Sequence, residues 1–158
     1  MNAVPTIDLS NINAETLQQI DTACRDHGFF KLVGHGLNDL LDEMWNQSER
    51  FFETPLDFKY ALMRPADSAF GYFNREMTKL KRDQKETFDY NGLDPDHSSG
   101  AMKNRWPDSS GNQPDQYRLA DFENTLKEFY AANAALAEKT LGLVLQALGE
   151  DANDLNDL

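Results

Sequence analysis

Apolar residues recur at helical spacing in several segments of the chain and predict its main helices. The clearest stripe follows i, i+3 and i+4 steps across residues 37–52. A second covers residues 14–27, where asparagines precede it as caps and Gly28 follows it as a C-terminal signal. A third runs from about residue 115 to residue 148, and its second half is apolar over most of its circumference. A short helix is expected to open at Pro55.

Shorter apolar segments predict strands between these helices. Residues 4–9 alternate in polarity, and a proline near their start is typical of an edge strand. Residues 29–33 are apolar on both sides of Lys31, which predicts a strand buried on both faces. Residues 71–73 and 86–91 are expected to form two further strands.

The remaining segments favour a single domain over residues 1–158, because no linker divides the chain. Residues 92–114 are rich in Gly, Pro, Ser, Asp and Asn and predict a long loop. Trp106 lies beside a proline in this loop and is expected to anchor it. The long helix is placed at residues 115–149, and residues 150–158 form an acidic tail.

Composition narrows the classes of partner. The chain has 158 residues and a formal net charge of −12, which argues against nucleic-acid binding and against adsorption to anionic lipid. No apolar segment approaches the ~20 residues of a membrane span, and no signal pattern opens the sequence, so a cytoplasmic protein is expected. Cys24 is the single cysteine, and we expect it to be buried on the apolar side of its helix.

Few polar residues suggest a site on their own. His27 and His35 flank the strand at residues 29–33, and we interpret them as a helix-end and a turn histidine rather than as metal ligands. Asp96 and His97 could form a weak metal or acid–base pair, although solvated loop residues are the simpler interpretation. The basic segment 79–82 is interpreted as a solvated turn, with contact to an anionic substrate or acidic partner as the alternative.

Several short motifs occur together in a characteristic order. They are Val-Pro-Thr-Ile-Asp-Leu at 4–9, Cys-Arg-Asp-His-Gly-Phe-Phe-Lys-Leu-Val-Gly-His-Gly-Leu at 24–37, Phe51-Phe52 through Pro55 with Lys59, Gly71-Tyr72, Lys-Glu-Thr-Phe at 85–88 and Asn-Arg-Trp-Pro at 104–107. With these motifs, the chain resembles the N-terminal region of the isopenicillin N synthase-like non-haem Fe(II), 2-oxoglutarate-dependent oxygenases. The resemblance implies an α+β fold: the N-terminal helical and strand portion of a double-stranded β-helix (jelly-roll) oxygenase, with the jelly-roll core largely absent.

The family's chemistry needs three protein ligands that leave iron open positions for 2-oxoglutarate and dioxygen. Family members supply a His-x-Asp with a distant second His, and an Arg-x-Ser holds 2-oxoglutarate. This sequence contains no His-x-Asp or His-x-Glu, and no arginine has a serine two residues later. The resemblance places those motifs in the second half of such enzymes. We therefore expect no catalytic or metal-binding residue here and no cofactor bound by this chain alone, with Fe(II) and 2-oxoglutarate used by the complete enzyme.

The resemblance does suggest substrate-binding positions, because the corresponding strands of family members face the substrate. On that basis Phe73, Thr87 and Asp89 are expected to line a substrate pocket, and the alternative is that they are ordinary core and surface residues. The penicillin-forming members carry an arginine and a tyrosine where this chain has Ala69 and Phe73. That departure puts a tripeptide substrate in doubt.

Two functional hypotheses follow. The first is the N-terminal scaffold and partial substrate pocket of an Fe(II)/2-oxoglutarate-dependent oxidoreductase acting on a small molecule, inactive without its iron-binding half. The second is a stand-alone, non-catalytic interaction or dimerisation module derived from such an oxygenase, which self-associates through its exposed apolar helix. Neither hypothesis involves nucleic acid or a membrane.

Overall fold

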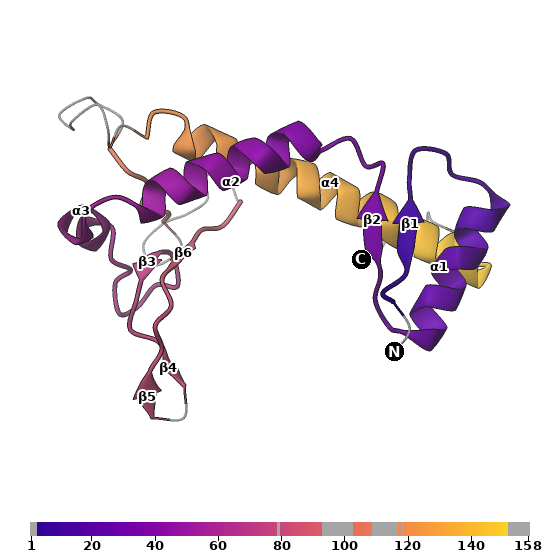
Figure 1. Cartoon of the computed structure of the whole chain (residues 1–158), viewed down its shortest axis with the longest axis horizontal. Coiled ribbons are helices and arrows are strands. Elements are labelled where there is room, and N and C mark those ends of the chain that lie inside the picture. The colour runs from indigo at the N-terminus through magenta and orange to yellow at the C-terminus, as the bar shows by residue number, and fades with distance from the viewer. Residues whose placement is uncertain (1–2, 79, 93–102, 109–116, 118, 152–158) are drawn as a thin grey trace. The chain divides into compact units, whose positions relative to one another are not determined.

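The computed structural model describes residues 3–78, 80–92, 103–108, 117 and 119–151 (Figure 1). Contacts group the chain into two compact units. The first comprises residues 1–39 and 131–158, and the second comprises residues 40–130. The single domain expected over the whole chain stays a prediction.

The first unit contains a β–α–β arrangement. Strand β1 (Thr6–Asp8) leads into helix α1 (Ala14–Asp26), and strand β2 (Lys31–Val33) follows. The two strands are parallel, and Ile7 lies opposite Leu32. Buried Ile7, Leu9 and Ile20 pack with Leu143 from the second half of helix α4 (Phe122–Leu148). The predicted strand at residues 4–9 and helix at 14–27 are confirmed, with shorter bounds.

Local capping explains why α1 begins at Ala14. The Asn13 side chain accepts hydrogen bonds from the backbone N–H groups of Glu15 (2.9 Å) and Thr16 (3.1 Å). In return, the backbone N–H of Asn13 donates to the Thr16 hydroxyl at 3.2 Å. This reciprocal capping box satisfies N–H groups that have no partner inside the helix. His27 is the C-cap, which confirms its interpretation as a helix-end residue.

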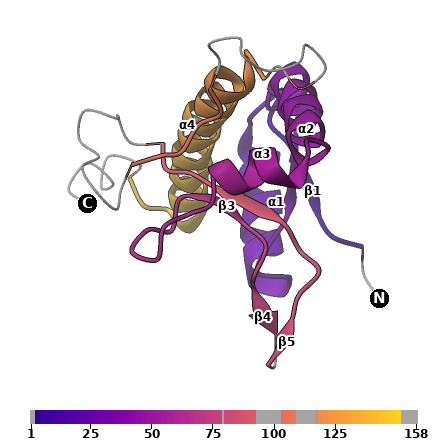
Figure 2. The same cartoon turned by 90° about the vertical axis from the view of Figure 1, so that its left-hand side faces the viewer.

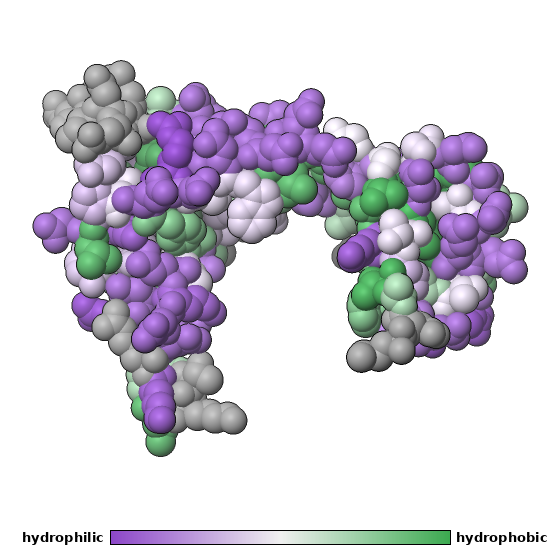
Figure 3. All heavy atoms as spheres, viewed as in Figure 1, coloured by the Kyte–Doolittle hydropathy of each residue, from purple (hydrophilic) through white to green (hydrophobic). Residues whose placement is uncertain are grey.

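Burial of β2 on both faces is wrong for this chain. Among the described residues, the strand pairs with β1 along one edge and with no strand along the other. Leu32 is half-buried, whereas Val33 and the preceding Phe29 are 42% and 60% exposed. Figure 3 shows apolar atoms at the surface over β2. An apolar segment indicates that a strand can be buried, but burial also needs a layer that covers it. Within the described part of this unit, no layer covers the face of β2 that carries Val33.

The predicted burial of Cys24 is also wrong, because its thiol is exposed. The buried residues of α1 are Thr16, Ile20 and Ala23. Cys24 lies one residue beyond Ala23, and about 100° of helical rotation takes its side chain off the buried face.

The second unit begins with helix α2 (Asn38–Phe52), whose first two residues belong to the first unit, and helix α3 (Leu56–Ala61). Four short strands follow: β3 (Gly71–Phe73), β4 (Met77–Thr78), β5 (Lys81–Arg82) and β6 (Thr87–Asp89). Strand β3 pairs antiparallel with β6, and β4 pairs antiparallel with β5. The β4–β5 hairpin lies between β3 and β6 in the chain and extends outward from the β3–β6 pair, as Figures 1 and 2 show. The helix expected over 37–52 and the short helix after Pro55 are confirmed.

Aromatic side chains form the core of the second unit. Phe51, at the end of α2, lies with its ring centroid 4.9 Å from those of Phe88 and Phe122. Tyr72 and Phe51 are fully buried. Trp106 packs against Phe88 at 5.7 Å, so the predicted anchoring of the loop through Trp106 is confirmed.

The described residues of the basic segment, 80–82, run from the turn of the β4–β5 hairpin into β5. Leu80 is 93% exposed and has a left-handed backbone with φ of 66°. Lys81 is exposed too, but it belongs to β5, and neither β4 nor β5 was predicted from the sequence. Within the described residues, no helix is both long enough and apolar enough to cross a membrane.

Helix α4 starts later than its sequence pattern suggests. It begins at Phe122 rather than near residue 115, because residues 119–121 form a turn in which Leu119 is buried in the aromatic core. In the long loop the described residues are 92 and 103–108, and the pair Asp96 and His97 lies outside the described part of the chain.

Candidate functional site

The β3–β6 pair separates core-facing residues from residues on its opposite face. Tyr72 lies opposite Phe88, and both side chains pack in the aromatic core. Alternation along a strand then places Phe73, Thr87 and Asp89 on the other face. The three residues predicted from the sequence therefore share one face of one sheet.

Direct contacts join these three residues. Phe73 and Thr87 are register partners. The Thr87 hydroxyl lies 3.4 Å from the Phe73 carbonyl oxygen and 3.3 Å from Asp89 Oδ2, and it can donate to either acceptor. Thr87 and Phe73 are half-buried, whereas Asp89 is exposed. The arrangement offers a carboxylate and an aromatic ring at the surface of a short sheet.

Arg64 completes the group and was missed by sequence reasoning. Its guanidinium carbon lies 3.6 Å from the Phe73 ring centroid, and its Nη1 lies 3.7 Å from Asp89 Oδ2. Stacking on an aromatic ring and pairing with a carboxylate are the interactions that a planar guanidinium favours. Nothing in the sequence around Arg64 signals this role, because its partners come from two strands that follow later in the chain.

Backbone contacts fix the position of Arg64. Its N–H donates to the Tyr72 carbonyl oxygen at 3.0 Å, and the Tyr72 N–H donates to the Leu62 carbonyl oxygen at 2.9 Å. Gly71 permits this close approach. It has φ of +123°, and a Cβ there would lie 2.6 Å from the Leu62 oxygen. A side chain at position 71 would therefore push the strand away from residues 62–64.

A hollow of about 530 Å³ adjoins the group. Its lining residues are Arg64, Pro65, Ala66, Asp67, Ser68, Ala69 and Phe73. It combines an apolar wall with one cation, Arg64, and one carboxylate, Asp67. Of the three residues predicted from the sequence, Phe73 lines this hollow, whereas Thr87 and Asp89 lie beside Phe73 and are not among the lining residues. Sites for small molecules typically have this composition and a volume of ~300–1,000 Å³.

A buried polar contact supports the same sheet from the core side. Lys59 Nζ donates to the Phe52 carbonyl oxygen at 2.7 Å and to Glu86 Oε2 at 2.6 Å. The Lys59 side chain is 5% exposed. It thereby links the end of α2, helix α3 and the residue before β6. Burial and the neighbouring charge of Glu86 raise the pKa of the Tyr72 phenol to about 12.

Residues 4–109 match the family described as "non-haem dioxygenase in morphine synthesis N-terminal". The chain belongs to this family. The resemblance of the sequence motifs to the N-terminal region of non-haem Fe(II), 2-oxoglutarate oxygenases is thus confirmed.

Individual relatives agree with the family. Gibberellin 20 oxidase 1 of Arabidopsis thaliana is 30% identical over 157 residues, covering 92% of this chain and 40% of the relative. A full-length Neurospora crassa protein, solved in complex with alpha-KG, has a TM-score of 0.74 at 23% identity and covers 95% of this chain. JOX2 in complex with 2OG, Fe and JA has a TM-score of 0.75 at 21% identity and covers 98%.

The chain spans less than half the length of these relatives, namely 40% of the oxidase, 49% of the Neurospora crassa protein and 43% of JOX2. The expected fold class is confirmed to the extent that the chain matches part of the fold of solved oxygenases. The described residues form helices and short strands shared with one part of oxygenase structures.

A dioxygenase of this family requires iron ligands, and the described residues do not fit that need. Among them, no three His, Cys, Asp or Glu side chains are grouped so that they could hold a metal ion. His35 Nδ1 accepts a hydrogen bond from the Leu37 N–H at 3.1 Å, which confirms its interpretation as a turn residue. His97 lies outside the described residues.

Proposed function

We propose that this chain forms the N-terminal scaffold and part of the substrate pocket of an Fe(II)/2-oxoglutarate-dependent oxygenase that acts on a small molecule. The observation that carries the proposal is the contact group of Arg64, Phe73, Thr87 and Asp89 beside the 530 Å³ hollow. Phe73 offers an apolar surface to substrate, and Asp89 offers an acceptor whose position Thr87 and Arg64 hold. Iron and 2-oxoglutarate are bound by residues outside this chain. We also expect a cytoplasmic location.

The test uses the protein that joins this chain to a half carrying His-x-Asp and Arg-x-Ser. In that protein, Asp89→Asn and Phe73→Ala should each lower kcat/KM for the organic substrate by about tenfold or more. Substrate-independent 2-oxoglutarate decarboxylation should stay near the unsubstituted rate. Asp57→Asn, which removes an exposed carboxylate from α3, is the matched control.

Unchanged kcat/KM in both variants would contradict the assignment of the pocket. Thermal unfolding of each variant separates a binding defect from loss of the fold. For the 158-residue chain alone, we expect no oxygen uptake with Fe(II) and 2-oxoglutarate. Turnover by the isolated chain would show that its own residues hold iron.

A stand-alone interaction module is a second candidate, favoured by exposed apolar residues in the first unit. Phe29 and Val33 are exposed around β2, and Leu141 and Leu148 are 47% and 57% exposed on α4. Surfaces of this kind often mark an interface. The two candidates differ in whether the coding sequence continues beyond Leu158 into His-x-Asp and Arg-x-Ser motifs.

A further inference from the structure

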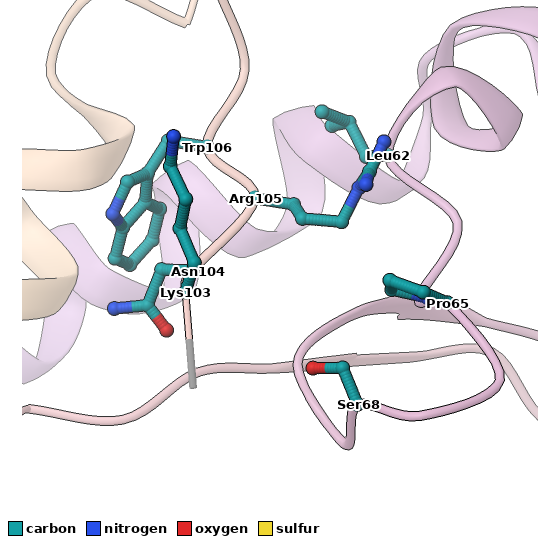
Figure 4. A pocket seen from close by; sticks show the side chains of 7 residues that line it. All are labelled: Leu62, Pro65, Ser68, Lys103, Asn104, Arg105 and Trp106. Atoms are coloured by element: carbon teal, nitrogen blue, oxygen red, sulfur yellow. The ribbon is translucent and has the colours of Figure 1, made fainter. Parts of the chain in front are cut away.

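A second hollow of the second unit, of about 510 Å³, adjoins the described part of the long loop (Figure 4). Its lining residues are Leu62, Pro65, Ser68, Lys103, Asn104, Arg105 and Trp106. Phe73, Thr87 and Asp89 are not among them. Pro65 and Ser68 also line the 530 Å³ hollow, but an inference about this hollow does not require Phe73, Thr87 or Asp89 to bind substrate.

Hydrogen bonds hold the loop side of the hollow in place. The Asn104 side chain accepts from the Asn91 N–H at 3.0 Å and donates to the Asn91 carbonyl oxygen at 2.9 Å. Trp106 packs against Tyr90 and Phe88. These contacts fix the backbone on both sides of Arg105, so the hollow is preorganised.

Arg105 is itself held. Its Nη2 donates to the carbonyl oxygen of Ala61, the last residue of α3, at 3.1 Å. A guanidinium has about five N–H donors, and this contact occupies one of them. Figure 4 shows the Arg105 side chain extended towards Leu62, and Lys103 beside Trp106.

The charge of this hollow differs from that of its neighbours. Lys103 and Arg105 supply two cations, and among the described residues no acidic side chain lines it. The other four hollows described for the chain each include at least one Asp or Glu. Lys103 and Arg105 therefore make the described lining of this hollow positive, although the chain as a whole has a formal net charge of −12. A positive lining favours anionic over neutral ligands.

We propose that this hollow binds a small organic carboxylate with an apolar ring or chain. The carboxylate is placed at Lys103 and Arg105, where charge-assisted hydrogen bonds are available. The apolar body lies against Leu62, Pro65 and Trp106. A bare inorganic anion would satisfy the cations but leave that apolar wall in contact with water.

The experiment follows the Trp106 indole N–H by NMR while cyclohexanecarboxylate is added. The chain has two tryptophans, and Trp45 is 64% exposed, so Trp45→Phe leaves Trp106 as the single indole signal without disturbing the core. Cyclohexanecarboxamide tests the need for charge, and inorganic phosphate tests the need for an apolar body. Both are titrated under identical salt.

We expect a saturable shift with the carboxylate and a midpoint at least about threefold higher with either comparison ligand. Lys103→Gln should raise the carboxylate midpoint by about three- to tenfold. Lys81→Gln removes another exposed lysine, from the β4–β5 hairpin, and should leave it unchanged.

Three results would overturn the proposal. They are equal midpoints for the carboxylate and the carboxamide, equal midpoints for the carboxylate and phosphate, and an equal effect of Lys103→Gln and Lys81→Gln. Because Lys103 is exposed, its substitution should leave the fold intact, and the dispersion of the remaining amide signals checks this.

Discussion

Among single residues, Phe51 is expected to contribute strongly to the stability of the second unit. Its ring is fully buried and contacts aromatic rings from α2, β6 and α4. Phe51→Ala should lower the free energy of unfolding by about 3–5 kcal/mol, because it removes apolar contacts and leaves a cavity. Phe29→Ala, at a site 60% exposed, is the matched control and should cost less than ~1 kcal/mol. Urea denaturation monitored by circular dichroism measures both, and similar losses would contradict the assigned core.

Tyr72 predicts a specific dependence of stability on alkaline pH. Its folded-state pKa of about 12 lies above the ordinary value of 10.0 because of burial first and the Glu86 charge second. Between these values the folded state binds more protons than the unfolded state, so the free energy of unfolding falls as pH rises from about 10 to about 12.

Tyr72→Phe should remove this contribution. Within the described residues the buried phenol oxygen has no hydrogen-bond partner, so the substitution should cost little at neutral pH. The difference between the denaturation midpoints at about pH 8 and about pH 11 should be smaller for the variant than for the unsubstituted chain. An identical pH dependence in both proteins would place the raised pKa elsewhere.

Among the elements, helices were predicted from sequence more closely than strands, for a physical reason. The ends of α1 depend on Asn13 and Gly28, which act within a few residues, and such signals are visible in sequence. The burial of a strand depends on which layer covers it, and the local sequence does not contain that information. The apolar residues 29–33 therefore predicted burial on both faces, although Val33 is exposed. The β4–β5 hairpin was missed because its turn contains Leu80 instead of the Gly or Asn that usually adopts positive φ.

The candidate site shows the same division. Phe73, Thr87 and Asp89 could be named in advance because two predicted strands and a family resemblance placed them. Arg64 could not, since it meets Phe73 and Asp89 only after the residues between them have folded. Lys103 and Arg105 likewise could not be predicted to line a hollow, because the other lining residues, between 62 and 68, lie far earlier in the chain.

Helix α1 gives a test of capping. Asn13→Ala should lower the free energy of unfolding of the first unit by about 1 kcal/mol, because two N–H groups of the first turn lose their acceptor. Asn13→Asp or Asn13→Ser should restore most of it. Asn11→Ala provides the control at a nearby exposed asparagine. Hydrogen exchange of the Glu15 and Thr16 amides reads the effect locally, and protection unchanged by Asn13→Ala would contradict the cap.

For the whole molecule, exposed apolar residues predict self-association. Leu141 and Leu148 lie about two turns apart on one side of α4, and both are exposed. We expect the apparent mass of the chain, measured by light scattering during size exclusion, to rise with concentration. Leu141→Ser with Leu148→Ser should reduce that rise, whereas Ala134→Ser on the same helix should not. A monomer at all concentrations would contradict the prediction.

The hidden amine of Lys59 has a practical consequence for following the opening of this protein. Acylating reagents reach exposed lysines such as Lys31 and Lys103 at once, but the Lys59 side chain is 5% exposed and its nitrogen is held by Phe52 and Glu86. Its labelling must wait until α3 separates from the residue before β6. The rate of Lys59 acylation, measured by mass spectrometry, therefore reports the rate at which residues 40–130 unfold, with no engineered probe.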